Sequence, residues 1–161
     1  MSTTNIYEII VGTPFAEDLD SDQCASLADR ITTRTLHNNE ILIKEGDVDS
    51  TLYIVAEGML AVERISGGGD PVTLHILRKG DLAGEMGFVD GAEHTATLRS
   101  VGDTLVVSLT RRDLESFLTA KPEIVYGVMR GIIRAVHRIL ARMNLQSIEL
   151  NNYITKSHGR Y

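Results

Sequence analysis

Between Gly46 and Gly102, apolar and polar residues alternate along several short segments of the chain. Alternation with a period of two is typical of β-strands that bury one face. Ten of the 14 glycines lie in this stretch, and those at Gly46, Gly58, Gly67 to Gly69, Gly80 and Gly102 mark turns between the segments. The alternating apolar positions are Leu52 and Ile54; Leu60 and Val62; Val72, Leu74 and Ile76; and Leu105, Val107 and Leu109. Many short strands joined by tight turns predict an antiparallel sandwich or barrel rather than a parallel sheet.

The segments on either side of these strands have helical spacing. Asp20 followed three residues later by Gln23 resembles a capping box, and Thr110 with Asp113 forms a similar pair after the last strand. The apolar face that follows the first capping box has the spacing i, i+3, i+4, i+7 and consists of Cys24, Leu27, Ala28 and Ile31. We therefore expect a mainly β domain flanked by helices.

The longest periodic segment begins at Pro122, a residue that suits the first turn of a helix. Apolar residues there alternate in steps of four and three, which is typical of a heptad seam, and only Gln146 interrupts it. The seam consists of Val125, Met129, Ile132, Val136, Ile139 and Met143, continued by Leu150. A second apolar set lies off the seam: Ile124, Val128, Ile133, Ala135 and Leu140.

A helix that is apolar on two sides must be covered on two sides. We expect this helix to pack on its own β domain with one face and on a second copy of the chain with the other, which predicts a homodimer. The alternative is a monomer in which one wide stripe faces the core. The expected organisation is one domain over residues 1–150, helical over 5–36, β over 37–109 and helical again over 110–150, with a polar, frayed tail over 151–161.

Composition narrows the class of protein. The chain has 161 residues with 43% hydrophobic and 24% charged positions, as in an ordinary globular domain. A lone cysteine, Cys24, excludes an internal disulfide framework, and neither a secretory signal nor a membrane-spanning apolar run is present. We therefore predict a cytoplasmic protein that does not bind a membrane.

The motifs of common enzymes are missing. The five histidines never fall at the i, i+4 spacing of a zinc helix, and neither Gly-x-Ser-x-Gly nor the Walker A pattern occurs. We expect no catalytic activity, no metal and no cofactor.

One segment, Gly80 to Leu98, carries a more specific pattern. A tight turn at Gly80-Asp81 precedes a brief helical turn at Gly84-Glu85-Met86-Gly87, and the next strand begins near Thr95. Unpaired amides at a helix start suit an anionic group, whereas a carboxylate such as Glu85 suits the hydroxyls of a sugar.

This segment resembles the phosphate-binding cassette of cyclic nucleotide-binding domains, the family of the catabolite activator protein and the regulatory subunits of protein kinase A. Its Gly-Glu pair is followed, nine residues after the Glu, by His94-Thr95-Ala96. The resemblance covers about residues 5–145 in the right order, with further matching segments at Thr13-Pro14-Phe15-Ala16, Lys44-Glu45-Gly46-Asp47 and Leu52-Tyr53-Ile54-Val55-Ala56-Glu57-Gly58. It implies a jelly-roll-like β-roll of about eight strands, with a cyclic nucleotide held inside it and a long final helix that closes the pocket.

The resemblance also implies the roles of individual residues. Glu85 would accept a hydrogen bond from the ribose 2′-hydroxyl, while the Thr95 hydroxyl and nearby backbone amides would hold the phosphate. The full ligand-binding set is Gly84, Glu85, Met86, His94, Thr95 and Ala96. Two departures stand out: His94 replaces the family's phosphate-binding arginine, and Ala83 replaces an aromatic residue.

These departures leave two hypotheses open. The first is a regulatory module that binds cAMP or cGMP and couples binding to movement of the last helix, where Arg130 and Arg134 are candidate lid residues. The second is a ligand-free β-roll that serves dimerisation or protein interaction, because its phosphate-binding arginine is lost. Either would act on an unidentified effector protein, and we expect no DNA binding.

Overall fold

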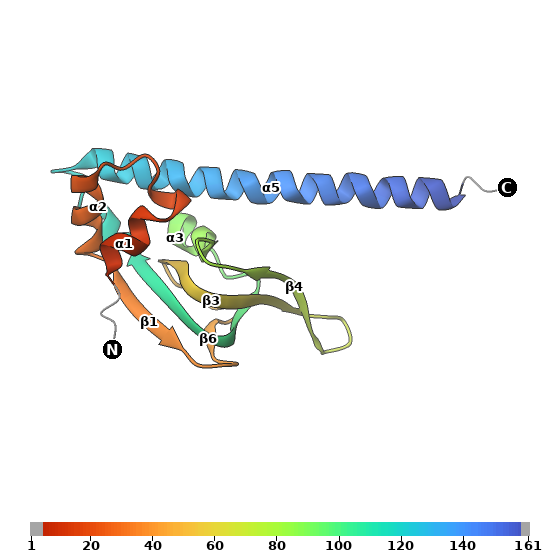
Figure 1. Ribbon diagram of the computed structural model, residues 1–161. Helices are drawn as coiled ribbons and strands as arrows, with labels where there is room; N and C mark the ends of the chain where they lie inside the picture. Colours follow the sequence, from red (N-terminus) through yellow and green to blue (C-terminus); the bar gives the residue numbers. More distant parts are fainter. Residues whose placement is uncertain (1–4, 159–161) are drawn as a thin grey trace.

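The structure, a computed structural model, describes residues 5–158. The strands form one antiparallel sheet, the helices lie beside it, and the last helix projects away from it (Figure 1). In chain order they are α1 (Ile6–Val11), the 3-10 turn η1 (Pro14–Ala16), α2 (Ser21–Ala28), β1 (Thr32–Leu36), β2 (Ile41–Ile43), β3 (Thr51–Ile65), β4 (Pro71–Leu77), β5 (Leu82–Ala83), α3 (Glu85–Asp90), β6 (Thr97–Thr110), α4 (Arg111–Glu115) and α5 (Pro122–His158).

The two long strands β3 and β6 form the centre of the sheet. The strand order is β1-β6-β3-β4, with β2 paired to β6 and β5 paired to β3. The pairing of β3 with β6 shifts its register on both sides of Glu57, next to Gly58. A Cβ on Gly58 would lie 2.6 Å from the Asp103 carbonyl oxygen, and its φ is +84°, so glycine is required at this bend. The prediction of a mainly β-roll flanked by helices is confirmed; the described residues form six strands instead of about eight because β3 and β6 bend without breaking.

The sheet buries both of its faces. Leu52 and Ile54 pack against the helices, whereas Leu60 and Val62, beyond the bend at Gly58, pack inside the roll. The register shift explains this change of side, since alternate residues of an unbroken strand share one face.

The alternating pattern in β4 predicts a buried apolar face, and this prediction is wrong for most of the strand. Val72 and Leu74 are exposed and only Leu77 is buried, because β4 is the edge strand and its hairpin extends beyond the roll (Figure 1). The Ser66 to Asp70 tip closes this hairpin, with the Ser66 amide donating to the Asp70 carbonyl at 2.9 Å.

The capping motifs place the flanking helices as predicted. Asp20 and Gln23 exchange hydrogen bonds of 2.8 and 2.9 Å at the start of α2, and the Thr110 hydroxyl accepts from the Asp113 amide at 3.1 Å before α4. The predicted helical range 5–36 was too long, however. Residues 32–36 form β1, because they pair with β6 and complete the sheet.

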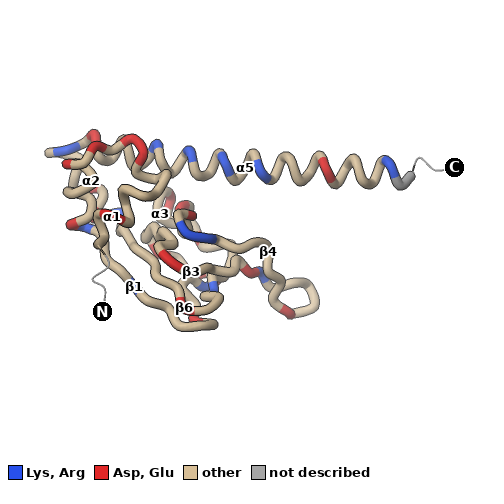
Figure 2. Tube along the Cα trace, in the orientation of Figure 1, with Lys and Arg blue, Asp and Glu red and all other residues tan. Residues whose placement is uncertain are grey.

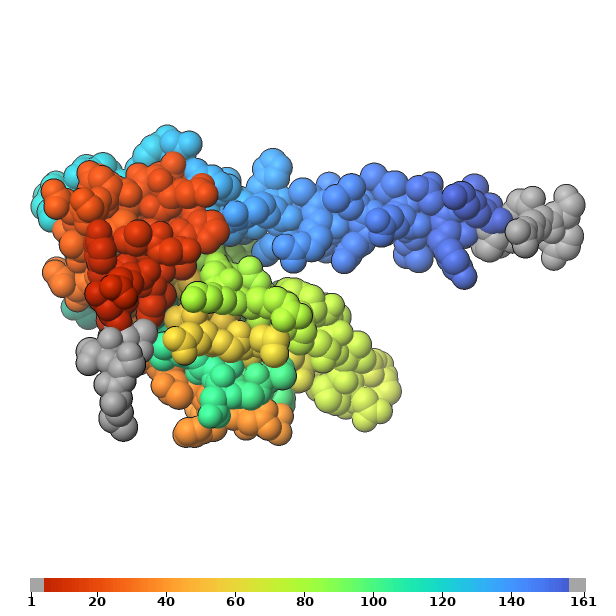
Figure 3. All heavy atoms as spheres, viewed as in Figure 1, coloured from red at the N-terminus to blue at the C-terminus, as the bar shows by residue number. Residues whose placement is uncertain are grey.

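Helix α5 has two halves with different environments. Its first half packs on η1 and on the core through Ile124, Val128 and Ile132. Its second half extends clear of the β-roll (Figures 1 and 3). Figure 2 shows basic residues spaced along the first half of α5 and acidic residues on the N-terminal segment beside it.

The helix is also longer than predicted. The range 151–158, expected as a frayed tail, continues α5, because neither glycine nor proline occurs between residues 132 and 158. The rest of the expected tail, 159–161, lies outside the described residues. Over residues 5–158, no helix combines the length and apolar character needed to cross a membrane.

Candidate functional site

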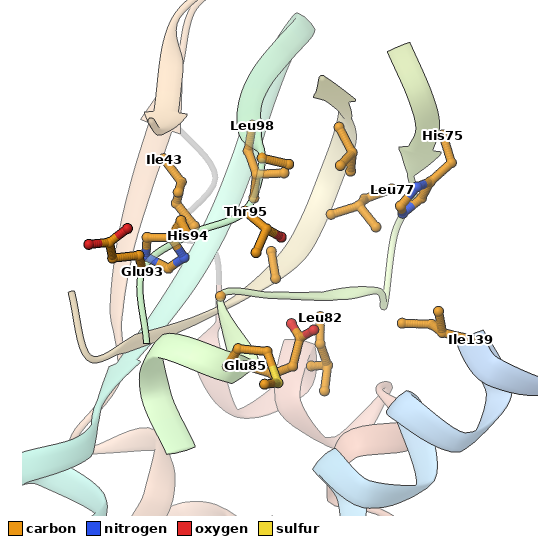
Figure 4. A pocket seen from close by; sticks show the side chains of 15 residues that line it. Ile43, His75, Leu77, Leu82, Glu85, Glu93, His94, Thr95, Leu98 and Ile139 are labelled. Atoms are coloured by element: carbon orange, nitrogen blue, oxygen red, sulfur yellow. The ribbon is translucent and has the colours of Figure 1, made fainter. Parts of the chain in front are cut away.

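A cavity of about 210 Å³ opens beside α3, between the β-roll and α5 (Figure 4). All six predicted ligand-binding residues line it, and they come from two segments of the chain: the start of α3 at 84–86 and the loop at 94–96 that precedes β6. The complete lining is Ile43, Val62, His75, Leu77, Leu82, Ala83, Gly84, Glu85, Met86, Glu93, His94, Thr95, Ala96, Leu98 and Ile139.

Local backbone geometry places Glu85 at this cavity. Strand β5 pairs with β3 and ends next to Gly84. The φ of +77° at Gly84 allows the chain to change direction and begin α3. A Cβ on Gly84 would lie 2.7 Å from the Thr51 carbonyl oxygen, so a larger residue would push α3 off the roll. Figure 4 shows the Glu85 carboxylate pointing into the cavity, on the side of Thr95.

The short helix α3 is held from behind by Arg111. The Arg111 guanidinium donates hydrogen bonds to the Phe88 carbonyl at 2.7 Å and to the Gly87 carbonyl at 3.2 Å. The Phe88 carbonyl lies in the last turn of α3, where helix carbonyls lack a partner further along the helix, and the Gly87 carbonyl also accepts from the Gly91 amide at 2.9 Å. Arg111 therefore positions α3, and with it Glu85, without lining the cavity.

The backbone of His94 is fixed by two hydrogen bonds, and its ring is buried. Its amide donates to the Asp47 carbonyl at 2.9 Å, and its own carbonyl accepts from the Gly46 amide at 2.8 Å. The side chain is 7% exposed, and its Nε2 lies 3.5 Å from Asp49 Oδ2. Within the described residues, this buried nitrogen has no hydrogen-bond partner.

A glycine in α3 makes room for this imidazole. A Cβ on Gly87 would lie 3.0 Å from Cε1 of His94 and 2.5 Å from the Asp49 carbonyl oxygen. Because Gly87 has no side chain, the buried His94 ring can lie this close to α3.

The charges around the cavity are unbalanced. Among the described lining residues there are two carboxylates, Glu85 and Glu93, and two imidazoles, His75 and His94, but no lysine or arginine. Burial, followed in importance by the charge of Asp49, raises the pKa of Tyr53, which lies behind Gly84. No group of three or more His, Cys, Asp or Glu side chains within residues 5–158 is arranged to hold a metal ion.

The predicted lid residues lie elsewhere in this structure. Arg134 binds Glu17 at 3.0 Å and Asp18 at 2.6 Å, and Arg130 lies 3.8 Å from Asp18. Both arginines therefore tie α5 to the acidic segment after η1, and neither lines the cavity. In this structure they pair with these nearer carboxylates, and their role as lid residues stays a prediction.

The heptad seam is divided between the two halves of α5. Ile132 is buried in the core of its own chain, and Val125, Met129 and Val136 are packed against that core. Met143 is 56% exposed. The first half of the seam is therefore partly covered within the chain, because the helix side of the sheet needs an apolar partner. Its use as a dimer seam stays a prediction.

Ile139, which the sequence argument assigned to the dimer seam, also lines the cavity from α5 (Figure 4). Its place in the dimer seam stays a prediction. The helical spacing shows that Ile139 belongs to the periodic apolar set of this helix. The spacing does not indicate which surface the Ile139 side chain faces. Glu93 and His75 also line the cavity without having been predicted.

Comparisons with known proteins identify the family. Residues 33–121, more than half of the chain, match the model of the cyclic nucleotide-binding domain. The Cyclic AMP receptor protein of Thermus thermophilus is 26% identical over 138 residues, which cover 86% of this chain and 64% of that protein. The chain spans less than two thirds of the length of the first curated relatives that it matches.

Solved structures agree with this assignment. The N-terminal domain of a transcriptional regulator from Streptomyces coelicolor has a TM-score of 0.72 and 27% identity, over 84% of this chain and 94% of that one. The regulatory subunit of a cAMP-independent protein kinase A from Trypanosoma cruzi, solved bound to guanosine, has a TM-score of 0.62 and 25% identity, over 74% of this chain and 43% of that one. The chain therefore belongs to the cyclic nucleotide-binding domain family.

Proposed function

We propose that this chain is a regulatory module that binds a cyclic nucleotide, cAMP or cGMP, in the β-roll cavity and couples binding to movement of α5. One observation carries the proposal: Glu85 and Thr95 of the cassette line the same cavity as Ile139 of α5. An occupant of this cavity would therefore contact the roll and the helix together.

The proposed contacts follow the family's cassette. Glu85 accepts a hydrogen bond from the ribose 2′-hydroxyl, since a carboxylate is an acceptor only. The Thr95 hydroxyl and the backbone amides near Gly84 and Ala96 hold the phosphate. His94 stands where the family has an arginine, so the phosphate lacks a permanent positive partner.

Movement of α5 requires that the ligand bind one helix position better than another. The first half of α5 is anchored by core contacts and by the Arg134 ion pairs, whereas the second half extends from the roll. Ile139 lies between the two halves, where a ligand contact would act on the helix at its exit from the domain.

Two relatives support a ligand with a ribose. The Thermus receptor is named for cyclic AMP, and the trypanosome regulatory subunit was solved with guanosine. A ribose is common to both molecules, and Glu85 is the residue proposed to bind it here.

Calorimetric titration with cAMP and cGMP tests the proposal. We expect saturable binding that Glu85→Ala weakens by roughly ten- to a hundredfold, because a hydrogen bond to a charged group is lost. Glu115→Ala, which removes an exposed carboxylate from α4, is the matched control and should leave binding unchanged. Hydrogen exchange along α5 should also change on binding; absence of binding at millimolar nucleotide would refute the proposal.

A second function is favoured by a separate observation, the exposed apolar side chains on the second half of α5. In this reading the β-roll is a scaffold, and the helix forms a homodimer or binds an effector protein. The side chains concerned are Leu140, Met143, Leu145, Ile148, Leu150, Tyr153 and Ile154.

Sedimentation equilibrium distinguishes this second function. Met143→Glu should convert a dimer to a monomer by placing a charge in the interface, whereas Asn152→Glu, off the heptad seam, should not. A monomer at all concentrations in the unchanged protein would exclude the homodimer.

A further inference from the structure

The cavity offers a ligand more negative charge than positive charge. Glu85 points into it and Glu93 stands at its rim (Figure 4). Behind the lining, Asp49 Oδ2 lies 3.5 Å from Nε2 of the buried His94 ring. The described lining residues include no lysine or arginine to balance these carboxylates. An anionic ligand would enter an environment of its own sign.

A cyclic phosphate matches this cavity poorly. Its charge must leave water, which is costly unless a donor or cation pairs with it. Its formation also consumes the 3′- and 5′-hydroxyls of the ribose, so the ligand keeps fewer donors for an acceptor-only carboxylate such as Glu85. The His94 ring also already faces a carboxylate, since its Nε2 lies 3.5 Å from Asp49 Oδ2.

An uncharged nucleoside matches the same groups better. Its ribose presents three hydroxyls, each able to donate to a carboxylate or to an imidazole nitrogen. The buried Nε2 of His94, which has no hydrogen-bond partner among the described residues, would gain one from such a hydroxyl. The remaining lining is largely apolar, with Leu77, Met86 and Ile139 available to the base.

We propose that an uncharged ribonucleoside is a ligand of this cavity and binds at least as tightly as its 3′,5′-cyclic phosphate. The inference rests on the proposed function, because it uses the same cavity and the same ribose contact at Glu85. The inference differs from the proposed function in the class of ligand, since it holds that the phosphate adds no net affinity in this cavity.

Parallel titrations with adenosine, guanosine, cAMP and cGMP test this inference. In the unchanged protein, at least one nucleoside should bind as tightly as its cyclic phosphate, or more tightly. His94→Arg restores a permanent cation and should strengthen cyclic nucleotide binding by roughly ten- to a hundredfold, with little effect on the nucleosides. His37→Arg, which adds the same charge at an exposed position outside the cavity, is the control.

A second variant covers the case in which an arginine disturbs the fold. Glu93→Gln removes a rim carboxylate at nearly constant shape, and should raise the affinity for cyclic nucleotides relative to nucleosides by a few-fold, about the size of an exposed charge interaction. Circular dichroism and thermal unfolding check that each variant is folded.

The outcomes separate the two proposals. Cyclic nucleotides that bind the unchanged protein tenfold or more tighter than both nucleosides would overturn this inference and leave the proposed function standing. Binding of neither class would overturn both. Nucleoside binding that equals or exceeds cyclic nucleotide binding, and is lost in Glu85→Ala, would support both the cavity and the ligand class.

Discussion

Replacing Gly131 by alanine should loosen the joint between α5 and the N-terminal segment. A Cβ at this position would collide with the backbone carbonyl oxygen of Phe15 in η1. Backbone cannot rotate away as a side chain can, so α5 or η1 must move. Gly127 lies one turn earlier, but a Cβ there would meet the tip of the Leu19 side chain at 2.5 Å, and that tip can turn aside.

The expected magnitude follows from two opposing effects. Alanine in a helix interior is ordinarily more stable than glycine by about 0.5–1 kcal/mol. Extra volume in a well-packed site costs about 1–3 kcal/mol. We therefore expect Gly131→Ala to lower the free energy of unfolding by about 1–2 kcal/mol, and Gly127→Ala to lower it less.

Urea denaturation followed by circular dichroism measures this difference. Ser147→Ala is the control, because Ser147 is exposed and lies on the second half of α5, which projects from the β-roll. Ile139 follows Gly131 by eight residues, about 12 Å along the helix. A shift of α5 should therefore also weaken ligand binding in the cavity. Unchanged or increased stability in Gly131→Ala would refute the reasoning, since it would mean that α5 does not pack on η1 as described.

Three further predictions concern the core and the site. Thr104→Val should cost about 1–3 kcal/mol in urea denaturation, because the buried Thr104 hydroxyl donates to a β3 carbonyl at 2.9 Å and accepts from Ser100 at 3.0 Å; an unchanged midpoint would contradict this. Burial raises the pKa of the Cys24 thiol, so iodoacetamide should alkylate the native protein far more slowly than the urea-unfolded protein at neutral pH. The same shift favours the neutral thiol in the folded state, so stability should be retained below the ordinary thiol pKa and fall as the pH rises above it. Arg111→Ala should weaken ligand binding by releasing α3, and Arg111→Lys should restore part of it; equal binding in all three proteins would show that α3 needs no such support.

Short-range patterns in the sequence were sufficient to place most of the elements. The capping box at Asp20 and Gln23, the cap at Thr110 and the helix start at Pro122 all depend on contacts within a few residues. The turn at Gly84 is equally local, because the backbone conformation there excludes most other residues. Such features are determined by the sequence itself, since the interacting groups are neighbours along the chain.

Only the tertiary structure decided which surface each periodic position faces. The spacing of the α5 apolar residues is the same whether a residue packs on its own core, as Ile132 does, or reaches the cavity, as Ile139 does. Arg134 meets Asp18, and His94 meets Asp49, across long separations in sequence that no periodicity encodes. Burial and charge pairing at these positions depend on where distant segments pack, and that is set by the whole folded chain.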